Sequence, residues 1–159
     1  MRVGIGYDSH RFAAGRRLIL GGVEVPAARG LAGHSDADVV AHAVTDALLG
    51  AAALGDIGTH FPPSDPAWKD ADSLDLLGRV CTWLGERGQR VHNVDVTIVC
   101  EEIRLAPFIP EMRARLARAL GIDVDRVSVK AKSNEGMGWI GRGEGAAALA
   151  VALIGPAAP

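Results

Sequence analysis

Hydrophobic and polar residues follow two periods along the chain, one typical of strands and one typical of helices. Alternation with β-branched residues predicts strands over 2–10, 91–100 and 126–133, and two short strands over 17–25 around Gly21-Gly22. Apolar residues at helical spacing predict helices over 36–54, 73–87 and 107–120. Ser35 and Asp38 have the spacing of a capping box at the first of these helices.

Two segments are less regular. Residues 144–154 are apolar throughout; their Ala and Leu favour a helix, whereas the preceding glycines and the context favour a buried strand. Gly141, Gly143 and Gly145 recur at period two, which predicts a strand face without side chains. Residues 56–71 hold three prolines and predict a long, functional loop. Strands alternating with helices predict a two-layer α/β domain.

Composition narrows the class of protein. The chain has 159 residues, which predicts a single domain over 1–159, and 17 basic against 19 acidic residues exclude an electrostatic nucleic-acid binder. Cys81 and Cys100 lie outside any CxxC motif, which excludes a disulfide scaffold and a four-cysteine zinc site. No segment resembles a signal peptide or a membrane span, so we expect a cytoplasmic protein with reduced thiols.

Three residues point to a metal site. Asp8 and His10 are two apart on a predicted strand, so their side chains share one face, although a strand end can carry two ordinary polar residues. His42 lies within an apolar helix, where an imidazole needs a partner such as a metal or a backbone carbonyl. Together the three leave one coordination position open, as in catalytic zinc sites. Asp46, four residues after His42, is a candidate to orient the imidazole.

Other polar residues are candidates for phosphate chemistry. His34 precedes a predicted helix N-terminus, which favours anions, although it also fits an exposed loop. Asp56 lies between glycines that allow close approach of a ligand, or it belongs to a simple helix-end turn. Lys132, Ser133 and Glu135 end a predicted strand; Glu135 suits Mg²⁺, but charged residues at a strand end are often only solvated.

In this order and spacing, several motifs resemble the 2-C-methyl-D-erythritol 2,4-cyclodiphosphate synthase family from end to end. They are Gly4–His10, His34–Val39 with His42, Thr45–Ala51, Gly55–Gly58, Phe61-Pro62, Asn93–Thr97 and Gly141–Gly145. The resemblance implies a two-layer α/β sandwich with a mixed sheet of about four main strands and helices on one face. It also implies a homotrimer whose sheets face the three-fold axis, with active sites between neighbouring subunits.

The family converts 4-diphosphocytidyl-2-C-methyl-D-erythritol 2-phosphate into the cyclic diphosphate and CMP. The resemblance implies one Zn²⁺ per subunit on Asp8, His10 and His42, a second ion (Mg²⁺ or Mn²⁺) on Glu135, and His34 and Ser133 beside the reacting phosphates. The substrate contacts it implies are Ser35, Asp46, Asp56, Gly58, Phe61, Ser64, Asp65, Cys100, Arg104, Ala106, Ala131, Lys132, Trp139 and Arg142. Of these, the cytidine pocket matches Cys100–Ala106 and Ala131–Ser133, on one subunit, and the zinc ligands belong to its neighbour.

The chain departs from the family at several of these positions. Ser133 keeps the hydroxyl of a common threonine, whereas Lys132 replaces a threonine that contacts the cytidine diphosphate. Pro63 stands where an acidic residue is common, so we expect the contact to a substrate hydroxyl either to be missing or to be supplied by Ser64 or Asp65. Two further departures are Arg104 for lysine and Trp139 for phenylalanine.

Two other functions fit the same residues. A zinc-dependent phosphohydrolase would use the three ligands and a bound water, and would release a linear phosphate. A non-catalytic module would bind nucleotides or isoprenoid diphosphates; the resemblance places Arg142 beside a central cavity that can take an isoprenoid diphosphate. No interaction with nucleic acid or membrane is expected.

Overall fold

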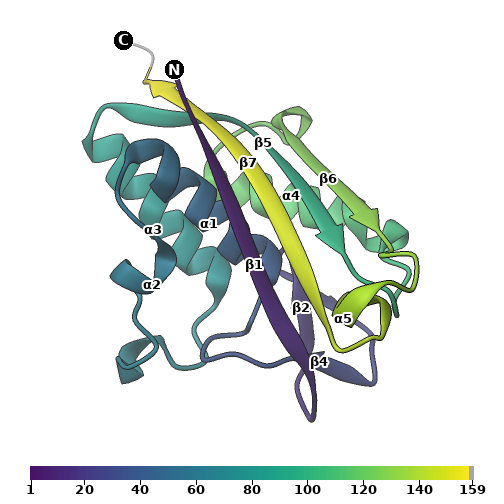
Figure 1. Cartoon of the computed structure of the whole chain (residues 1–159). Helices are drawn as coiled ribbons and strands as arrows, with labels where there is room; N and C mark the ends of the chain where they lie inside the picture. Colours follow the sequence, from purple (N-terminus) through teal and green to yellow (C-terminus); the bar gives the residue numbers. More distant parts are fainter. Residues whose placement is uncertain (158–159) are drawn as a thin grey trace.

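The computed structural model describes residues 1–157, and its main feature is a curled five-stranded sheet (Figure 1). The strand order is β4-β1-β7-β5-β6, and every neighbouring pair is antiparallel except the parallel pair β5–β6. The strands are β1 (Arg2–Ala14), β4 (Arg29–Leu31), β5 (Gln89–Val99), β6 (Val127–Lys132) and β7 (Gly145–Pro156).

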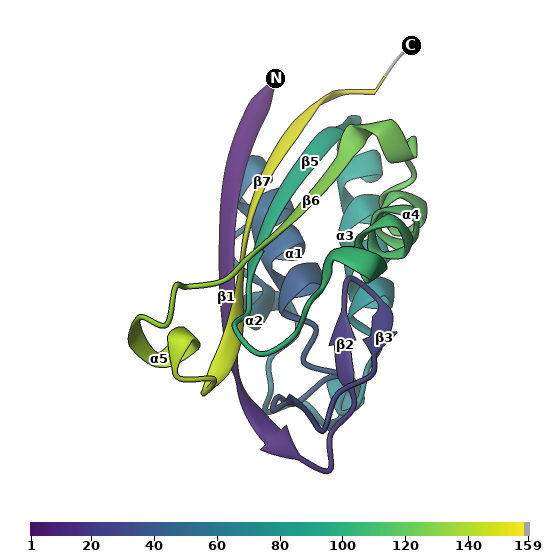
Figure 2. The same ribbon diagram turned by 90° about the vertical axis from the view of Figure 1, so that its right-hand side faces the viewer.

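Three longer helices cover one face of this sheet, which confirms the mixed two-layer α/β class (Figure 2). They are α1 (Val39–Ala52), α3 (Ser73–Glu86) and α4 (Ile109–Leu120). The short strand β4 extends the four predicted main strands to five. The buried residues between the layers are mainly Leu, Val and Ala, so apolar burial holds the layers together.

Helix α1 lies directly against β1 because two glycines of the strand leave room for its backbone. A Cβ on Gly4 would stand 2.0 Å from the carbonyl oxygen of Ala47, and one on Gly6 would stand 1.9 Å from that of Ala43. No side chain fits at either position. The two glycines therefore fix the distance between β1 and α1.

The N-terminus of α1 differs from the capping-box prediction. The helix begins at Val39 and its cap is Asp38, whose carboxylate accepts hydrogen bonds from the N–H groups of Val40 and Ala41. The same carboxylate accepts bonds from Gly21 and Gly22, at the turn between β2 (Leu18–Leu20) and β3 (Val23–Val25). That pair is the predicted hairpin, and both glycines have the positive φ that its turn requires. Ser35 therefore does not cap the helix.

The ambiguous segment 144–154 is a strand. It forms most of β7, which pairs with β1 on one side and β5 on the other, and this central place explains its apolar character. The prediction of a bare glycine strand face is wrong, because Gly141 ends the short helix α5 (Gly138–Gly141) and Gly143 lies in a turn. Only Gly145 is in the strand, where a Cβ would stand 2.3 Å from the carbonyl oxygen of His10.

The predicted loop 56–71 is more regular than expected. It contains the one-turn helix α2 (Ile57–His60) and the 3₁₀ turn η1 (Pro66–Trp68). Two further 3₁₀ turns flank α4, η2 (Ala106–Phe108) and η3 (Val124–Arg126). The short elements of 57–68 hold one wall of the candidate site described below.

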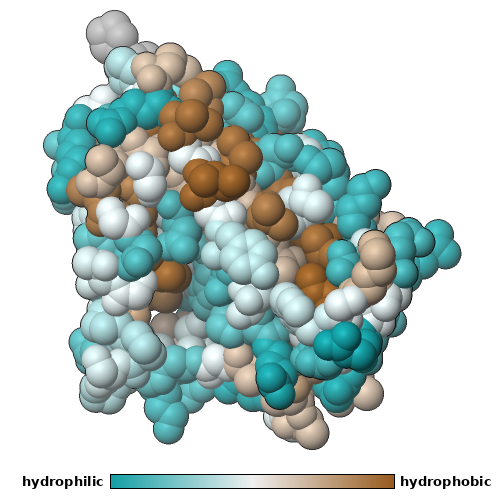
Figure 3. All heavy atoms as spheres, in the orientation of Figure 1, coloured by the Kyte–Doolittle hydropathy of each residue, from teal (hydrophilic) through white to brown (hydrophobic). Residues whose placement is uncertain are grey.

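The sheet face turned away from the helices carries exposed apolar side chains. Figure 3 shows them gathered over β1 and β7. They are Val3, Ile5, Tyr7, Leu149 and Val151. Ile5 pairs with Val151 and Tyr7 with Leu149 in the strand register, so the side chains form one contiguous patch, termed here the outer apolar face. A patch of this kind typically marks an interaction surface.

Two further observations concern helices and thiols. Within residues 1–157, no helix combines the length and the apolar character needed to cross a bilayer. Cys81 and Cys100 carry free thiols.

Candidate active site

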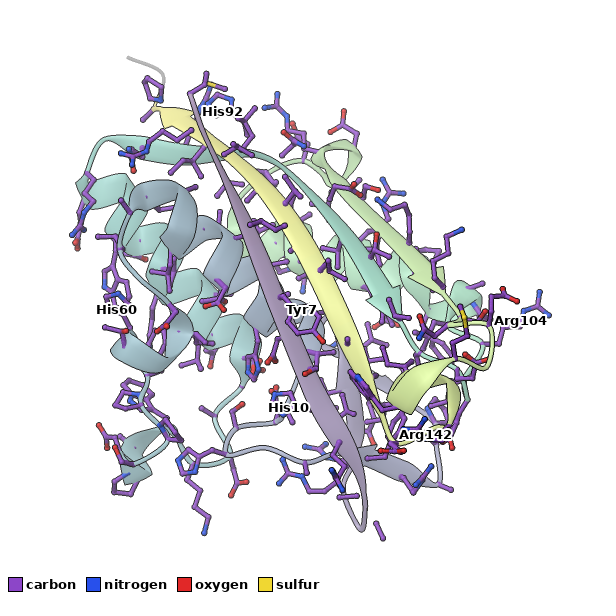
Figure 4. The ribbon with its side chains drawn as sticks, viewed as in Figure 1. Tyr7, His10, His60, His92, Arg104 and Arg142 are labelled. Carbon is purple, nitrogen blue, oxygen red and sulfur yellow. The ribbon has the colours of Figure 1, made fainter. Side chains whose placement is uncertain are left out.

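The structure brings the three predicted metal ligands together. Asp8 and His10, on β1, lie together with His42, on α1; Figure 4 labels His10 among them. The Asp8 Oδ2 atom lies 3.0 Å from His10 Nε2 and 2.9 Å from His42 Nδ1, and the two ring nitrogens are 3.3 Å apart. One nitrogen or oxygen of each residue therefore points to a common centre.

These spacings fit a tetrahedral zinc ion. Zinc ligands at about 2.0–2.1 Å from the metal lie about 3.3 Å from one another, close to the three distances found here. Two imidazoles and one carboxylate also form a donor set that suits zinc and leaves a fourth position open. The residues therefore fit the ion that their pattern predicts.

Asp8 and His42 each stabilise the charged form of the other. Burial alone would raise the pKa of Asp8, but hydrogen bonds from His10 and His42 hold it well below its usual range. Burial alone would lower the pKa of His42, but its hydrogen bond and charge interaction with Asp8 raise it. The pair therefore holds a negative carboxylate at the position where a cation would bind.

The far edge of the His42 ring is held by two serines. Its Nε2 atom lies 2.8 Å from Ser73 Oγ and 3.1 Å from Ser35 Oγ. The prediction that Asp46 orients this ring is wrong, because the Asp46 carboxylate instead accepts a 2.7 Å hydrogen bond from the N–H of Ile57 and so anchors α2. Burial raises the pKa of Asp46.

A cavity of about 210 Å³ opens beside the metal ligands. His34 and Ser35 lie on its polar side with the three ligands, and its remaining wall is apolar. The apolar wall consists of Ile57, Gly58, Phe61, Pro63, Trp68 and Leu76. Phe61 stacks on Trp83 at 5.5 Å between ring centroids and meets Trp68 edge-on, so aromatic packing supports this wall.

Several predicted substrate contacts stabilise the backbone around this cavity. Asp56 caps α2 by accepting from the N–H and hydroxyl of Thr59, and these two bonds lower its pKa. Asp65 caps η1 through Ala67, while its carbonyl lies 3.3 Å from His34 Nε2. Ser64 is exposed beside them.

Another set of the predicted residues forms a second group, which does not line this cavity. They lie where β5 and β6 end, and they are Cys100, Arg104, Ala106, Ala131, Lys132, Ser133 and Glu135. The Ser133 hydroxyl donates to Glu135 at 3.2 Å, and Glu135 has a left-handed φ of 52°. One chain therefore separates the predicted zinc ligands from the predicted second-metal ligand.

Trp139 and Arg142 occupy a third place, on and just after α5. Trp139 lines a shallow cavity of about 240 Å³ with Ser9, His10 and Glu144. The Arg142 guanidinium is exposed and donates to Glu144 at 2.7 Å (Figure 4). It does not contact the metal ligands.

Sequence reasoning missed four residues around the centre. Ser73 and Asp36 lie behind His42, Trp68 closes the cavity wall, and Arg16 braces the loop that carries His34. Asp36 stands within a motif that was recognised, but Ser73 is 31 residues from His42 and only the folded chain joins them. Local spacing gives no signal for such a contact.

The fold and the site define an α/β domain with three candidate metal ligands beside a cavity. Residues 1–155 match the model of the YgbB family. A protein of Symbiobacterium thermophilum named 2-C-methyl-D-erythritol 2,4-cyclodiphosphate synthase is 60% identical over 97% of this chain and 98% of its own length. A protein of the same name from Chlorobaculum tepidum is 58% identical over the same shares.

Solved structures of similar proteins point to the same family as these relatives. A 2C-methyl-D-erythritol-2,4-cyclodiphosphate synthase solved in a form with bound CDP is 34% identical with a TM-score of 0.89, covering 97% of this chain and all of the other. The bifunctional IspDF of Campylobacter jejuni is 39% identical with a TM-score of 0.94 over 98% of this chain, which spans 42% of that longer protein.

The chain belongs to the YgbB family. Its activity is that of the family's 2-C-methyl-D-erythritol 2,4-cyclodiphosphate synthases, as the near-complete match at about 60% identity shows. It is therefore a cyclising lyase of the non-mevalonate isoprenoid pathway, and neither a phosphohydrolase nor a non-catalytic binding module is favoured.

Proposed function

We propose that Asp8, His10 and His42 hold a zinc ion that takes part in the cyclisation of 4-diphosphocytidyl-2-C-methyl-D-erythritol 2-phosphate. The observation that carries this proposal is the spacing of 2.9–3.3 Å among their three ligand atoms, beside the cavity that contains His34. A zinc ion bound there supplies Lewis-acid charge to a phosphate oxygen. The same arrangement leaves the cavity side of the centre open to that oxygen.

The chain's own residues position the reactants. In the reaction the 2-phosphate oxygen attacks the β-phosphorus and CMP leaves, so one P–O bond forms and one breaks. The nucleophile is already an anion and needs no general base; the barrier is the approach of two negatively charged groups. His34 is proposed to donate a hydrogen bond to a phosphate oxygen. The cavity wall around Phe61 is proposed to hold the methylerythritol chain and exclude water.

The second group of residues is proposed to come from a neighbouring subunit of a homotrimer. Ser133 would face the phosphates of the partner's site, and Glu135 would hold Mg²⁺ or Mn²⁺, which prefer carboxylate and phosphate oxygens. Lys132 would contact the cytidine diphosphate, and Arg104 and Cys100 would belong to the cytidine pocket. Two observations support this: the group lies outside the cavity of its own chain, and the outer apolar face is exposed without a partner.

Residues 1–159 are proposed to form one domain that acts in the cytoplasm. Arg142 and Trp139 lie shortly before the first residue of β7, Gly145. They are proposed to border a central cavity that binds an isoprenoid diphosphate. The exposed Arg142 guanidinium supports this, since breaking its surface pair with Glu144 costs about 1 kcal/mol or less.

The reaction is tested by ³¹P NMR of the protein with its substrate, Zn²⁺ and Mg²⁺. We expect two coupled diphosphate resonances from a cyclic product and CMP in equal amount. Linear phosphates would instead indicate a phosphohydrolase, and a metal-loaded protein without turnover would indicate a binding module.

The shared site is tested by mixing inactive variants. His42→Ala and Ser133→Ala are each expected to be inactive, but remixed trimers should recover about one quarter of wild-type activity if each site takes His42 from one subunit and Ser133 from the next. The matched control mixes His42→Ala with His34→Ala, which lie on the same side of the site and should recover nothing. No recovery in the first mixture would contradict a shared site.

A further inference from the structure

Both nitrogens of the His42 ring have partners, and these partners differ in kind. Nδ1 faces Asp8 and His10, at 2.9 and 3.3 Å. Nε2 faces the hydroxyl of Ser73 at 2.8 Å, in a position where the Ser73 side chain is 1% exposed. A neutral imidazole carries its proton on only one nitrogen, so the partners decide which one.

The Ser73 hydroxyl has its own proton already committed. It donates a hydrogen bond to the Asp36 Oδ1 atom, while the Ser73 N–H donates to Asp36 Oδ2 at 3.0 Å. An ionised carboxylate only accepts, so the hydroxyl must donate to it and present a lone pair to His42. The Nε2 atom of His42 therefore carries the ring proton.

In the neutral ring, the form in which a histidine binds a metal, this arrangement leaves the lone pair on Nδ1, which faces the metal position beside Asp8 and His10. We propose that Ser73, held by Asp36, is a positioning pair that sets the tautomer and the orientation of His42 for metal binding. The inference rests on the proposed zinc site and adds two residues to it. Groups of this kind behind a metal-binding histidine typically change metal affinity 10- to 100-fold.

Ser35 also touches Nε2 but is not equivalent to Ser73. Its Oγ lies 3.1 Å from Nε2, accepts a bond from the N–H of Ala37 at 3.3 Å, and has no carboxylate behind it. Its hydroxyl proton is therefore not fixed, and Ser35 does not dictate the tautomer. The polarity of the contact comes from Asp36 through Ser73.

The pair also joins separate parts of the fold to the metal centre. Ser73 is the first residue of α3 and Asp36 lies before α1, whose cap Asp38 donates its own N–H to Asp36 at 3.1 Å. The start of α3 is thereby attached to the histidine that α1 supplies. Removing the Ser73 hydroxyl should loosen the His42 ring without removing a ligand.

The test measures zinc affinity without substrate. We expect the zinc dissociation constant, from competition with a chelator, to rise 10- to 100-fold in Ser73→Ala and to rise also in Asp36→Asn. The matched control is Thr45→Val, which removes another buried hydroxyl from α1, one that donates to the Ala41 carbonyl rather than to His42. The control should lose stability but keep the wild-type zinc constant within twofold.

A second readout follows the ring proton itself. In NMR spectra of the zinc-loaded protein, the His42 Nε2 proton should exchange slowly with water in the wild type and fast in Ser73→Ala. Zinc affinity within twofold of wild type in Ser73→Ala and Asp36→Asn, or an equal loss in Thr45→Val, would overturn the inference. A wild type that binds no zinc would instead overturn the proposed zinc site.

Discussion

Gly6 on β1 and Ala43 on α1 touch through their backbones, with room for a hydrogen but not for a methyl group between them. Asp8 follows Gly6 by two residues, and His42 precedes Ala43 by one. The contact therefore sets the separation between the strand and the helix that supply the metal ligands. This packing contact brings the strand and the helix close enough for Asp8 to pair with His42.

The first prediction concerns this contact. Gly6→Ala should lower the free energy of unfolding by about 3 kcal/mol and weaken zinc binding, because the strand and the helix must move apart. Urea denaturation and zinc titration measure the two effects. Gly78→Ala is the control: nothing lies near its added methyl on α3, so that variant should gain about 0.5–1 kcal/mol. Equal stability of the two variants would contradict the argument.

Removal of a ligand separates metal binding from folding. His42→Ala should lose zinc and all measurable cyclisation, while its circular dichroism spectrum stays that of the wild type. Metal content by mass spectrometry checks the first effect. His92 lies on β5, at the end of the sheet where β1 begins and away from the metal ligands, so His92→Ala should keep its zinc (Figure 4). An active, metal-free His42→Ala protein would refute the zinc site.

Arg16 braces the loop that carries His34 and Ser35. Its guanidinium donates to the carbonyl of Ser35 at 2.7 Å and to that of Leu31 at 3.2 Å. Lysine keeps the charge but cannot span two carbonyls, so Arg16→Lys should reduce kcat/KM about tenfold. The neighbouring Arg17 has only a surface pair with Glu24, so Arg17→Lys should leave kcat/KM unchanged. Similar kinetics of the two variants would show that the brace is dispensable.

The buried carboxylate of Asp38 accepts four backbone N–H groups, two from the hairpin turn and two from α1. Asp38→Ala leaves these donors without partners in the core and should cost about 3 kcal/mol or more of unfolding free energy. Asp72 is the exposed cap of α3 and accepts only one such bond, from the N–H of Leu74. Asp72→Ala should therefore cost only about 1 kcal/mol of unfolding free energy. Thermal unfolding of both variants measures the difference.

The two cysteines should react slowly while the chain is folded. Burial raises the pKa of Cys81 to about 12, and burial also raises the pKa of Cys100. Since the thiolate is the reactive form, a raised pKa leaves almost none of it at pH 8. A disulfide reagent at that pH should label less than one thiol per native chain and both after denaturation. Rapid native labelling would contradict the packing around Cys81.

Much of the site was predictable because its signals are local. Asp8 and His10 share a strand face by spacing alone, and a histidine within the apolar run around His42 stands out in any helix. The contacts behind the ring were not predictable, because Ser73 reaches His42 only once α3 has packed on α1. For Asp46, the helical spacing correctly placed the residue near His42, but its carboxylate accepts a hydrogen bond from the N–H of Ile57 instead of orienting the ring.

The fold shows the same division. The glycine pair at the hairpin and the C-terminal ends of α3 and α4 could be predicted from the sequence, since they depend on neighbouring residues. The strand 145–156 was ambiguous because Ala and Leu suit both states; its place between β1 and β5 decides the outcome. The cap at Asp38 rather than Ser35 likewise depends on the distant turn at Gly21.

Tyr7 and Asp8 are consecutive on β1, and their side chains leave the strand on opposite faces. The tyrosine belongs to the outer apolar face, the aspartate to the metal centre. Tyr7 is also the only tyrosine of the chain. A single fluorine label on its ring would therefore test two proposals from one position, namely contact between subunits of the proposed trimer on its own side and binding of the proposed zinc ion one peptide unit away.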